Sequence, residues 1–347
     1  MSWRRLRVIL AGLSLLAQMH SASAQDPKPA AQSNPLKAVR TFMYQLQGLE
    51  EAGAVEKLAQ SSYDLLVVEP TFTVKGSESF DAKGMVAKLK AGKPGRLVIA
   101  YVDIGEAERF RVYWAKSWKQ PTKKKRGDPV FLLAPDPDGW KDDVSIAFWH
   151  PEWKALWLGE HGLIQQIMAA GFDGVYMDWV EACQEKRVVA AARADGVEPV
   201  GAMVDFIAEI RRQVRQARPE GVVIAQNAQE LIDLEPRYAR VIDGVGFEDT
   251  WFSGKADAAW DNARGGDIAN TGKDEDSTAG RLKQYGKYLS AGIPVFTIDY
   301  CLKPENAARV YEAARKAGVV PLVTRVSLER MTTTPPPGVE SESQRGK

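Results

Sequence analysis

Eight apolar, β-rich runs are spaced along the chain, and segments with a helical pattern separate most of them. The runs cover residues 41–46, 64–69, 96–103, 174–178, 222–226, 241–247, 294–299 and 319–326. Several are continuous Val, Ile and Leu stretches, as expected of strands that are covered on both faces. Helical patterns at residues 153–170, 204–217, 279–291 and 304–317 precede the fourth, fifth, seventh and eighth runs. Strands that alternate with helices pair in parallel through crossover connections.

The simplest architecture for eight such strands is an α/β fold of the (β/α)8 (TIM) barrel type, which we predict as one domain over residues 39–330. The connections after the third strand (109–170) and after the sixth strand (from Thr250 on) are long, so we expect long loops there. A doubly wound open sheet is the alternative. It would carry a Gly-rich phosphate turn after an early strand, and the sequence has no such turn.

The two ends of the chain differ in composition from the barrel region. Residues 1–24 combine three arginines with an apolar run and end in the small residues SASA, a pattern typical of a cleavable secretory signal with Gln25 as the first mature residue. The run is too short for a membrane anchor, so no membrane insertion is expected after signal removal. Residues 25–38 are predicted as a flexible leader and residues 331–347 as a disordered tail. We therefore expect a secreted or periplasmic protein.

Composition excludes several classes of protein. Lys and Arg number 46 against 45 Asp and Glu, so no charge excess draws the chain to nucleic acid. Two cysteines and three histidines exclude a disulfide scaffold and a four-ligand structural zinc motif. No cofactor is predicted, and the sequence has no Walker-type phosphate loop. The absence of a Gly-x-Ser-x-Gly elbow argues against an α/β-hydrolase esterase. A magnesium site built from carboxylates stays open as an alternative, with loss of activity on chelation as its test.

The two cysteines, Cys183 and Cys301, are expected to stay unbridged. They follow the fourth and seventh predicted strands, which lie well apart around an eight-membered ring. A disulfide needs Cα atoms within about 7 Å of each other.

Polar residues stand where the predicted strands end, and the chemistry of a barrel belongs at the C-terminal ends of its strands. The polar candidates are Glu69, Asp103, Glu106, Asp178, Asn227, Glu248, Asp299 and Arg325. The aromatic candidates around them are Tyr44, Tyr101, Trp179, Trp251 and Tyr300. Sugars offer hydroxyls to charged acceptors and C–H faces to rings, so carboxylates beside aromatic side chains are typical of a carbohydrate site.

Several candidates have plain structural alternatives. Asp178 could cap the next helix, and Glu248 could form a structural ion pair. Asp103 and Asp299 are weaker candidates for catalysis, because each is as well suited to hold a neighbouring loop or a substrate hydroxyl as to transfer a proton. Asn227 could be an ordinary turn residue.

Cleavage of a glycosidic bond needs one protonated carboxyl group and one ionised carboxylate on the other side of the bond. We expect Glu248 to be the acid, because the aromatic residues at positions 247, 251 and 252 would favour its neutral form by desolvation. Asp178 would stay ionised, hydrogen-bonded by Asn227 or near Arg325, and would act as nucleophile or base.

Five segments strengthen this interpretation through a resemblance. They are 101–108 (YVDIGEAE), 171–178 (GFDGVYMD), 224–227 (IAQN), 246–248 (GFE) and 295–300 (VFTIDY), in this order. Together they resemble glycoside hydrolase family 114, whose members are endo-α-1,4-polygalactosaminidase-like TIM-barrel proteins. The resemblance covers about residues 40–327. It implies secretion, hydrolysis of galactosamine-containing polysaccharide, and a catalytic pair that falls on Asp178 and Glu248.

The sequence therefore predicts a secreted or periplasmic glycoside hydrolase with a two-carboxylate mechanism and a polysaccharide substrate. A cationic amino-sugar polymer is favoured, because carboxylates far outnumber basic groups at the strand ends, where Arg325 is the one clear cation. The alternative is a non-catalytic carbohydrate-binding barrel of the cell envelope, which would keep the aromatic residues but need no proton donor.

Overall fold

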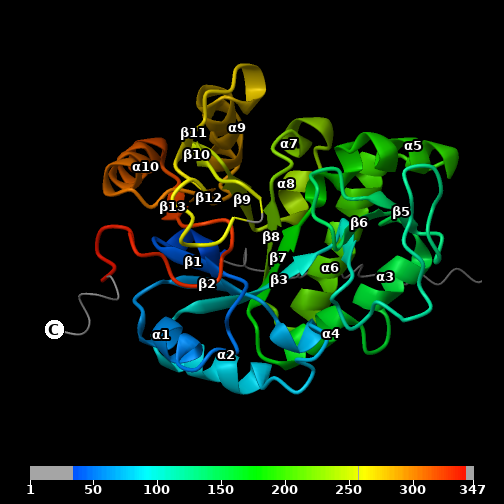
Figure 1. Cartoon of the computed structure of the whole chain (residues 1–347), viewed down its shortest axis with the longest axis horizontal. Coiled ribbons are helices and arrows are strands. Elements are labelled where there is room, and N and C mark those ends of the chain that lie inside the picture. Colours follow the sequence, from blue (N-terminus) through cyan, green and yellow to red (C-terminus); the bar gives the residue numbers. More distant parts are fainter. Residues whose placement is uncertain (1–33, 257, 341–347) are drawn as a thin grey trace, which may run out of the picture. The chain divides into compact units, whose positions relative to one another are not determined.

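The computed structural model of the chain describes residues 34–256 and 258–340. Within them, eight parallel strands form one sheet in the order β1-β2-β3-β7-β8-β9-β12-β13 (Figure 1). Their bounds are β1 Phe42–Gln45, β2 Leu65–Val68, β3 Leu97–Asp103, β7 Gly174–Asp178, β8 Val222–Gln226, β9 Gly244–Glu248, β12 Val295–Asp299 and β13 Val320–Val323. Each strand falls on one of the eight predicted runs, which confirms the (β/α)8 prediction.

The sheet curls until its two edge strands meet. Strands β1 and β13 are neighbours, and the backbone N–H groups of Leu46 and Gln47 donate to the Leu328 carbonyl oxygen at 2.9 and 3.2 Å. The barrel is filled by side chains, among them the rings of Tyr44 and Tyr176, whose centroids are 5.2 Å apart. Gly246 makes room for this packing, because a Cβ atom there would lie 1.9 Å from the Tyr176 hydroxyl oxygen.

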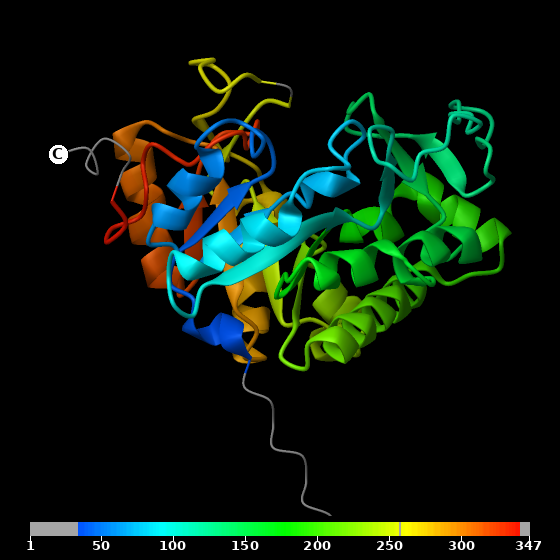
Figure 2. The same ribbon diagram turned by 90° about the horizontal axis from the view of Figure 1, so that it is seen from below.

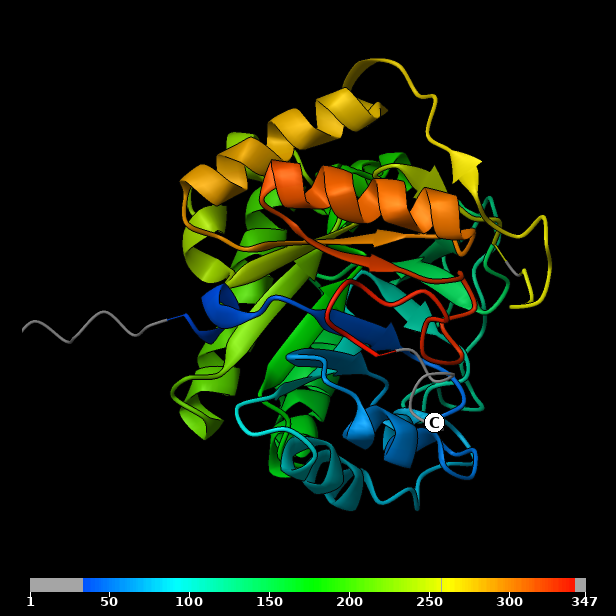
Figure 3. The ribbon, with the colours of Figure 1, turned by 90° about the vertical axis from the view of Figure 1, so that its left-hand side faces the viewer.

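Helices cover the outside of the barrel (Figure 2). Their bounds are α1 Ala54–Gln60, α2 Ala82–Ala91, α3 Pro151–Leu158, α4 Leu163–Ala169, α5 Lys186–Ala194, α6 Pro199–Ala217, α7 Leu231–Leu234, α8 Tyr238–Val241, α9 Thr278–Ser290 and α10 Pro304–Ala317. Short 3-10 helices are η1 Pro35–Ala38, η2 Thr71–Thr73, η3 Val180–Gln184 and η4 Asp274–Asp276. Figure 3 shows α9 and α10 beside each other over β12 and β13. In the described ranges, no helix is both long and apolar enough to span a membrane.

One predicted helix is interrupted in the structure. Residues 153–170 do not form a single helix, because α3 ends at Gly159 and α4 begins after Gly162. Between them, His161 has a positive φ of 62°, a backbone conformation that a helix cannot contain. The other three predicted helices lie on α6, α9 and α10.

The two long connections carry small sheets of their own. Between β3 and β7, the strands β4 Glu106–Glu108, β5 Leu132–Pro135 and β6 Asp143–Ile146 form an antiparallel sheet in the order β4-β6-β5. Between β9 and β12, β10 Phe252–Ser253 pairs with β11 Ile268–Ala269. The expected long loops after the third and sixth barrel strands are present, and both are partly structured.

The folded body extends beyond the predicted limits of 39 and 330. Asn34 and η1 belong to it, because Leu36 is fully buried and the Asn34 side-chain amide donates to the Asp243 carbonyl at 2.6 Å. After residue 330, the Tyr311 hydroxyl donates to the Thr334 carbonyl at 2.5 Å, and Val339 is buried. The predicted signal segment 1–24, the leader up to residue 33 and residues 341–347 lie outside the described residues.

The two cysteines are buried and free, as predicted from their positions around the barrel.

Candidate active site

A cavity of about 550 Å³ opens at the C-terminal ends of the barrel strands, and we call it the central cavity. Nine of the thirteen predicted site residues line it, and four do not. The nine are Tyr44, Glu69, Tyr101, Asp103, Asp178, Trp179, Asn227, Glu248 and Tyr300.

The turns after three neighbouring strands shape this cavity. Trp179, Asn227 and Asp249 directly follow β7, β8 and β9, and their φ angles are 54°, 56° and 57°. Residues other than glycine rarely adopt this left-handed conformation, and it is concentrated at functional sites where the surrounding structure enforces it. Each sharp turn leaves the last side chain of its strand at the barrel mouth.

Asp178 is the last residue of β7, and two donors hold its carboxylate. The Tyr101 hydroxyl donates to Oδ2 at 2.6 Å, and the Trp179 backbone N–H donates to Oδ1 at 2.8 Å. Burial, and then the charge of Glu248, raise the pKa of Asp178 to about 7, against the lowering effect of these two hydrogen bonds. Asp178 is therefore poised to change protonation near neutral pH.

Glu248 is the last residue of β9 and has three donors. The Gln226 amide donates to Oε2 at 2.8 Å, the Asn227 amide donates to the same oxygen at 3.3 Å, and the Tyr300 hydroxyl donates to Oε1. Burial, and then the charge of Asp249, raise the pKa of Glu248 to about 7. The two carboxyl groups thus reach similar pKa values, and each keeps its own set of donors.

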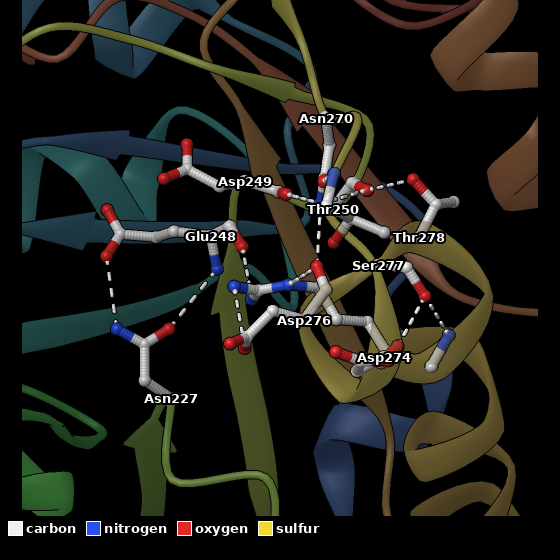
Figure 4. A network of polar contacts seen from close by, with 12 residues as sticks. Asn227, Glu248, Asp249, Thr250, Asn270, Asp274, Asp276, Ser277 and Thr278 are labelled. Carbon is white, nitrogen blue, oxygen red and sulfur yellow. Dashed lines mark hydrogen bonds and ion pairs between the residues drawn. The ribbon is translucent and has the colours of Figure 1, made fainter.

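Asn227 joins the loops around Glu248 (Figure 4). Its side-chain oxygen accepts the Glu248 backbone N–H at 3.3 Å, and its NH2 group also donates to Glu181 Oε1 at 3.1 Å. On the other side, Arg281 donates to the Glu248 carbonyl at 3.0 Å, and Asn270 donates to the carbonyls of Asp249 and Asp276. The Glu248 backbone is therefore fixed from both the β8 and the β9–β12 connections.

The predicted surroundings of the two carboxyl groups were wrong in detail. Phe247 does not face Glu248, because it stacks on Tyr285 with ring centroids 4.5 Å apart. Polar donors surround Glu248 instead, although burial still raises its pKa as expected. Asp178 is held by Tyr101 and Trp179 rather than by Asn227 or Arg325.

Four predicted site residues do not line the central cavity. The Asp299 carboxylate is fully buried and accepts the N–H groups of Trp251 and Phe252 at 2.6 and 2.8 Å, so it anchors the β9–β10 connection, with Trp251 as its partner. Arg325 forms an ion pair with Asp267 at 2.9 Å. Glu106 is buried in β4, where its Oε1 accepts from the Ser145 hydroxyl at 3.1 Å.

Two predicted residues at the cavity wall have mainly supporting contacts. Asp103 Oδ1 accepts the N–H groups of Gly105 and Glu106 at 3.0 and 2.8 Å, which shapes the turn after β3. Glu69 is paired with Arg111, a residue that the sequence gave no reason to select. The Arg111 guanidinium lies buried between Glu69 and Glu108, with Nη2 at 3.1 Å from Glu69 Oε2 and Nε at 2.6 Å from Glu108 Oε2.

Sequence reasoning also missed Gln226, Glu181 and part of the inserted sheet. Gln226 ends β8 and would have been found by taking the last residue of every predicted strand. Burial, and then the charge of Asp178, raise the pKa of Glu181 to about 8, and in the described structure its Oε2 has no hydrogen-bond partner. Asp138 and Trp140 come from the β5–β6 hairpin. They do not stand at the end of a predicted barrel strand, so their sequence position did not select them.

The central cavity is strongly acidic. Within the described ranges, carboxylate residues line it and Lys, Arg and His do not. The nine carboxylates are Glu50, Glu69, Asp103, Glu108, Asp138, Asp143, Asp178, Glu181 and Glu248. In the described part of the chain, no group of three or more His, Cys, Asp or Glu side chains is placed so that it could hold a metal ion.

Comparison with known proteins gives the class and then the family. A barrel with two partly buried carboxyl groups at its mouth is the arrangement of a glycoside hydrolase. The model of glycoside-hydrolase family GH114 matches residues 20–339, and the chain belongs to this family. The protein is therefore a glycoside hydrolase.

Relatives and solved structures agree with this placement. An uncharacterized protein of Deinococcus radiodurans is 33% identical over 311 residues, which are 89% of this chain and 87% of that protein. The glycoside hydrolase domain of PelA from Pseudomonas aeruginosa superposes with a TM-score of 0.59 at 16% identity, over 85% of this chain and 98% of that domain. Aspergillus fumigatus Ega3, solved in complex with galactosamine, gives a TM-score of 0.57 at 14% identity, over 87% and 94% of the two chains. At these identities, the two structures establish the shared fold.

Proposed function

We propose that the enzyme cleaves galactosamine-containing polysaccharide at internal bonds, with Asp178 and Glu248 as the two catalytic carboxyl groups. The observation that carries the proposal is their placement. Both are partly buried side chains at the ends of barrel strands, both line one cavity, and their pKa values are raised to about 7. Glycosidic cleavage needs two such groups on opposite sides of the bond.

Glu248 is proposed as the general acid and Asp178 as the opposed carboxylate, nucleophile or base. The adjacent carboxylate of Asp249 favours the protonated form of Glu248. The main charge that acts on Asp178 is that of Glu248 itself, so protonation of Glu248 favours an ionised Asp178, which the Tyr101 hydroxyl and the Trp179 N–H then stabilise. Because ionisation of one carboxyl group makes ionisation of the other less favourable, a state in which the two groups hold a single proton is favoured near neutral pH.

The charge of the cavity supports a cationic amino-sugar polymer as substrate. Seven of the lining carboxyl groups have no ion pair in the described structure, and an ammonium group bound among them would favour their ionised forms, whereas the carboxylates of a uronate polymer would oppose them. Ega3, a protein with the same fold, was solved with galactosamine bound.

The shape of the site supports cleavage within a chain. A second hollow of about 420 Å³, which we call the side cavity, adjoins the central cavity and shares Glu248, Tyr300, Asn227 and Glu181 with it. Glu248 therefore lies between two spaces, so that a polymer can occupy both sides of the scissile bond.

The site of action is proposed to be outside the cytoplasm, in the periplasm or the medium. The support is the arrangement of arginines, apolar run and small residues in positions 1–24. Cell fractionation with mass spectrometry of the N-terminus tests it, and we expect a mature protein that begins at Gln25. Full-length protein in the cytoplasm would refute export.

The function is tested by measuring oligosaccharide release from partially de-N-acetylated galactosaminan, chitosan and polygalacturonate. Wild type, Asp178→Asn, Glu248→Gln and the control Glu160→Gln, which changes an exposed carboxyl group, are compared. We expect a ladder of internal fragments from galactosaminan with wild type and the control. Faster release from polygalacturonate would overturn the substrate assignment. Binding of galactosaminan without any release would favour the non-catalytic carbohydrate-binding barrel.

A further inference from the structure

The hairpin between β5 and β6 reaches the cleft from outside the barrel. Its tip, residues 136–142, belongs to the small sheet of the β3–β7 connection, which lies next to α5 (Figure 1). Trp140 and Asp138, both from this tip, line the central cavity and also the side cavity. The tip therefore stands where the two spaces join, although no barrel strand contributes to it.

The tip is held in one shape before any ligand arrives. The Trp140 backbone N–H donates to Asp136 Oδ2 at 2.7 Å, and Gly139 has a φ of 101°, a conformation suited to glycine. The Arg109 backbone N–H donates to the Asp142 carbonyl at 2.9 Å, and their side chains form an ion pair at 3.1 Å. A surface that is already ordered loses little conformational entropy when it binds a ligand.

Trp140 offers an apolar face at this junction. Its side chain is 38% exposed, although an indole is among the most costly groups to leave in water. An exposed tryptophan that lines a cleft is suited to stack against the C–H face of a sugar ring.

The residues below the tip include carboxyl groups that have no ion-pair partner in the described structure. Asp136 is 9% exposed and Glu106 is 1% exposed, and within the described structure Asp136 Oδ1 and Glu106 Oε2 have no hydrogen-bond partner. Burial, and then the charges of Asp136 and Asp143, raise the pKa of Glu106 to about 10. Burial, and then the charge of Asp136, raise the pKa of Asp138. Lys141 is in the tip but lines neither cavity. A bound cation would reduce the repulsion among these groups.

We propose that Trp140 and Asp138 form a sugar-binding subsite for an ammonium-bearing hexose unit of the polymer, away from the bond that is cleaved. The indole supports the ring, and the Asp138 carboxylate pairs with the ammonium group. The subsite rests on the proposed function for its polymer, but it adds residues that neither the strand ends nor the catalytic pair contain.

The experiment compares Trp140→Ala, Trp140→Phe and Asp138→Asn in the full mature protein. Oligosaccharides of two to eight units are used, either fully de-N-acetylated or fully N-acetylated. For long de-N-acetylated oligomers, Trp140→Ala raises KM about tenfold with kcat little changed, and Trp140→Phe restores most of the loss. Asp138→Asn raises KM about threefold for the de-N-acetylated series and leaves the N-acetylated series unchanged.

Asp142→Asn is the control for charge, because Asp142 is in the same tip but lines neither cavity; since it also breaks the ion pair with Arg109, it is used with its melting temperature measured alongside. It removes the same charge, so an equal effect on KM would show that only the overall field of the tip matters and would overturn the subsite. An unchanged KM in Trp140→Ala, or an equal loss of kcat on short and long oligomers, would overturn it as well.

Calorimetric binding of the same oligomers separates this proposal from the proposed function. If wild type binds de-N-acetylated oligomers through Trp140 and Asp138 but releases no fragments, the catalytic proposal fails and the subsite holds. If wild type cleaves the polymer, and Trp140→Ala and Asp138→Asn bind and cleave it as wild type does, the subsite is refuted and the proposed function stands. If wild type neither binds nor cleaves, both are refuted.

Discussion

The hydrogen bond from Tyr101 to Asp178 offers a direct test of how the catalytic pair divides its roles. Tyr101→Phe removes the hydroxyl that lies 2.6 Å from Asp178 Oδ2 and leaves the ring in place. A hydrogen bond to a charged group contributes about 1.5–3 kcal/mol, and one pKa unit corresponds to about 1.36 kcal/mol. The pKa of Asp178, already about 7, should therefore rise by about one to two units.

The sign of the effect follows from the proposed role. Asp178 acts in its ionised form, and a higher pKa lowers the ionised fraction at every pH below the new value. The acidic limb of the kcat/KM profile should move to higher pH by about one to two units. Well below neutral pH, this shift amounts to a loss of about 10- to 100-fold.

The assay is the pH dependence of kcat/KM on a defined galactosamine oligomer, for wild type, Tyr101→Phe and Tyr238→Phe. Tyr238 is the control, because its hydroxyl is buried without a hydrogen-bond partner in the described structure and does not line the central cavity. If Tyr101→Phe lowered kcat/KM by the same factor at all pH values, Tyr101 would act on the substrate and not on Asp178. An upward shift of the alkaline limb instead would make Asp178 the proton donor and reverse our assignment.

Three further predictions concern the catalytic pair and two buried polar residues. Asp178→Asn and Glu248→Gln should each lower kcat by about 100-fold or more with an unchanged melting temperature, and a substrate with a good leaving group should restore Glu248→Gln in particular; near-normal turnover in either variant would contradict the pair. Arg96→Met should lose about 3–5 kcal/mol of unfolding free energy in urea, because the buried guanidinium donates to backbone carbonyls of five residues, from Leu58 to Leu89; a loss below about 1 kcal/mol would show that water replaces it. Asp299→Ala should cost about 2–4 kcal/mol of stability and leave KM within about twofold, because its carboxylate binds two backbone N–H groups rather than the cavity; a large rise in KM at full stability would return it to the substrate site.

The barrel was predictable from the sequence because its strands are covered on both faces. In β2, β8 and β12 every residue is buried and most are apolar, so the runs stand out from the amphipathic helices between them. The carboxyl ends of parallel strands lie at the same end of the barrel. This is why Asp178 and Glu248, 70 residues apart in the chain, could be placed together without any distance.

The error about Phe247 could have been avoided with the same reasoning. Successive side chains of a strand point to opposite faces. If Glu248 points into the barrel mouth, Phe247 must point outward toward the helices, where it stacks on Tyr285. Proximity in sequence was taken for proximity in space, and the actual donors to Glu248 come from β8 and from the residue after β12.

The paired arginines show what sequence alone does not provide. Arg325 was expected as a free cation at the mouth, but Asp267 from the β9–β12 connection neutralises it. Arg111 was not selected, although it joins Glu69 at the end of β2 to Glu108 in β4. Asp267 comes from the β9–β12 connection, and Arg111 comes from the β3–β7 connection. The path of these inserted segments over the barrel is set by tertiary contacts and leaves no periodic pattern in the sequence.

These pairings determine where the charge of the cavity comes from. Arg111 offsets Glu69 and Glu108, so the field that acts on a substrate comes from the other seven lining carboxylates. Asp178 and Glu248 are the proposed catalytic pair, whereas Asp138 and Asp143 belong to the hairpin of the β3–β7 connection. In the proposed function, the barrel strands therefore supply the catalytic pair, and the β3–β7 connection supplies part of the charge that would favour a cationic sugar. Replacing the hairpin tip should change which polymer is bound before it changes how the bond is cleaved.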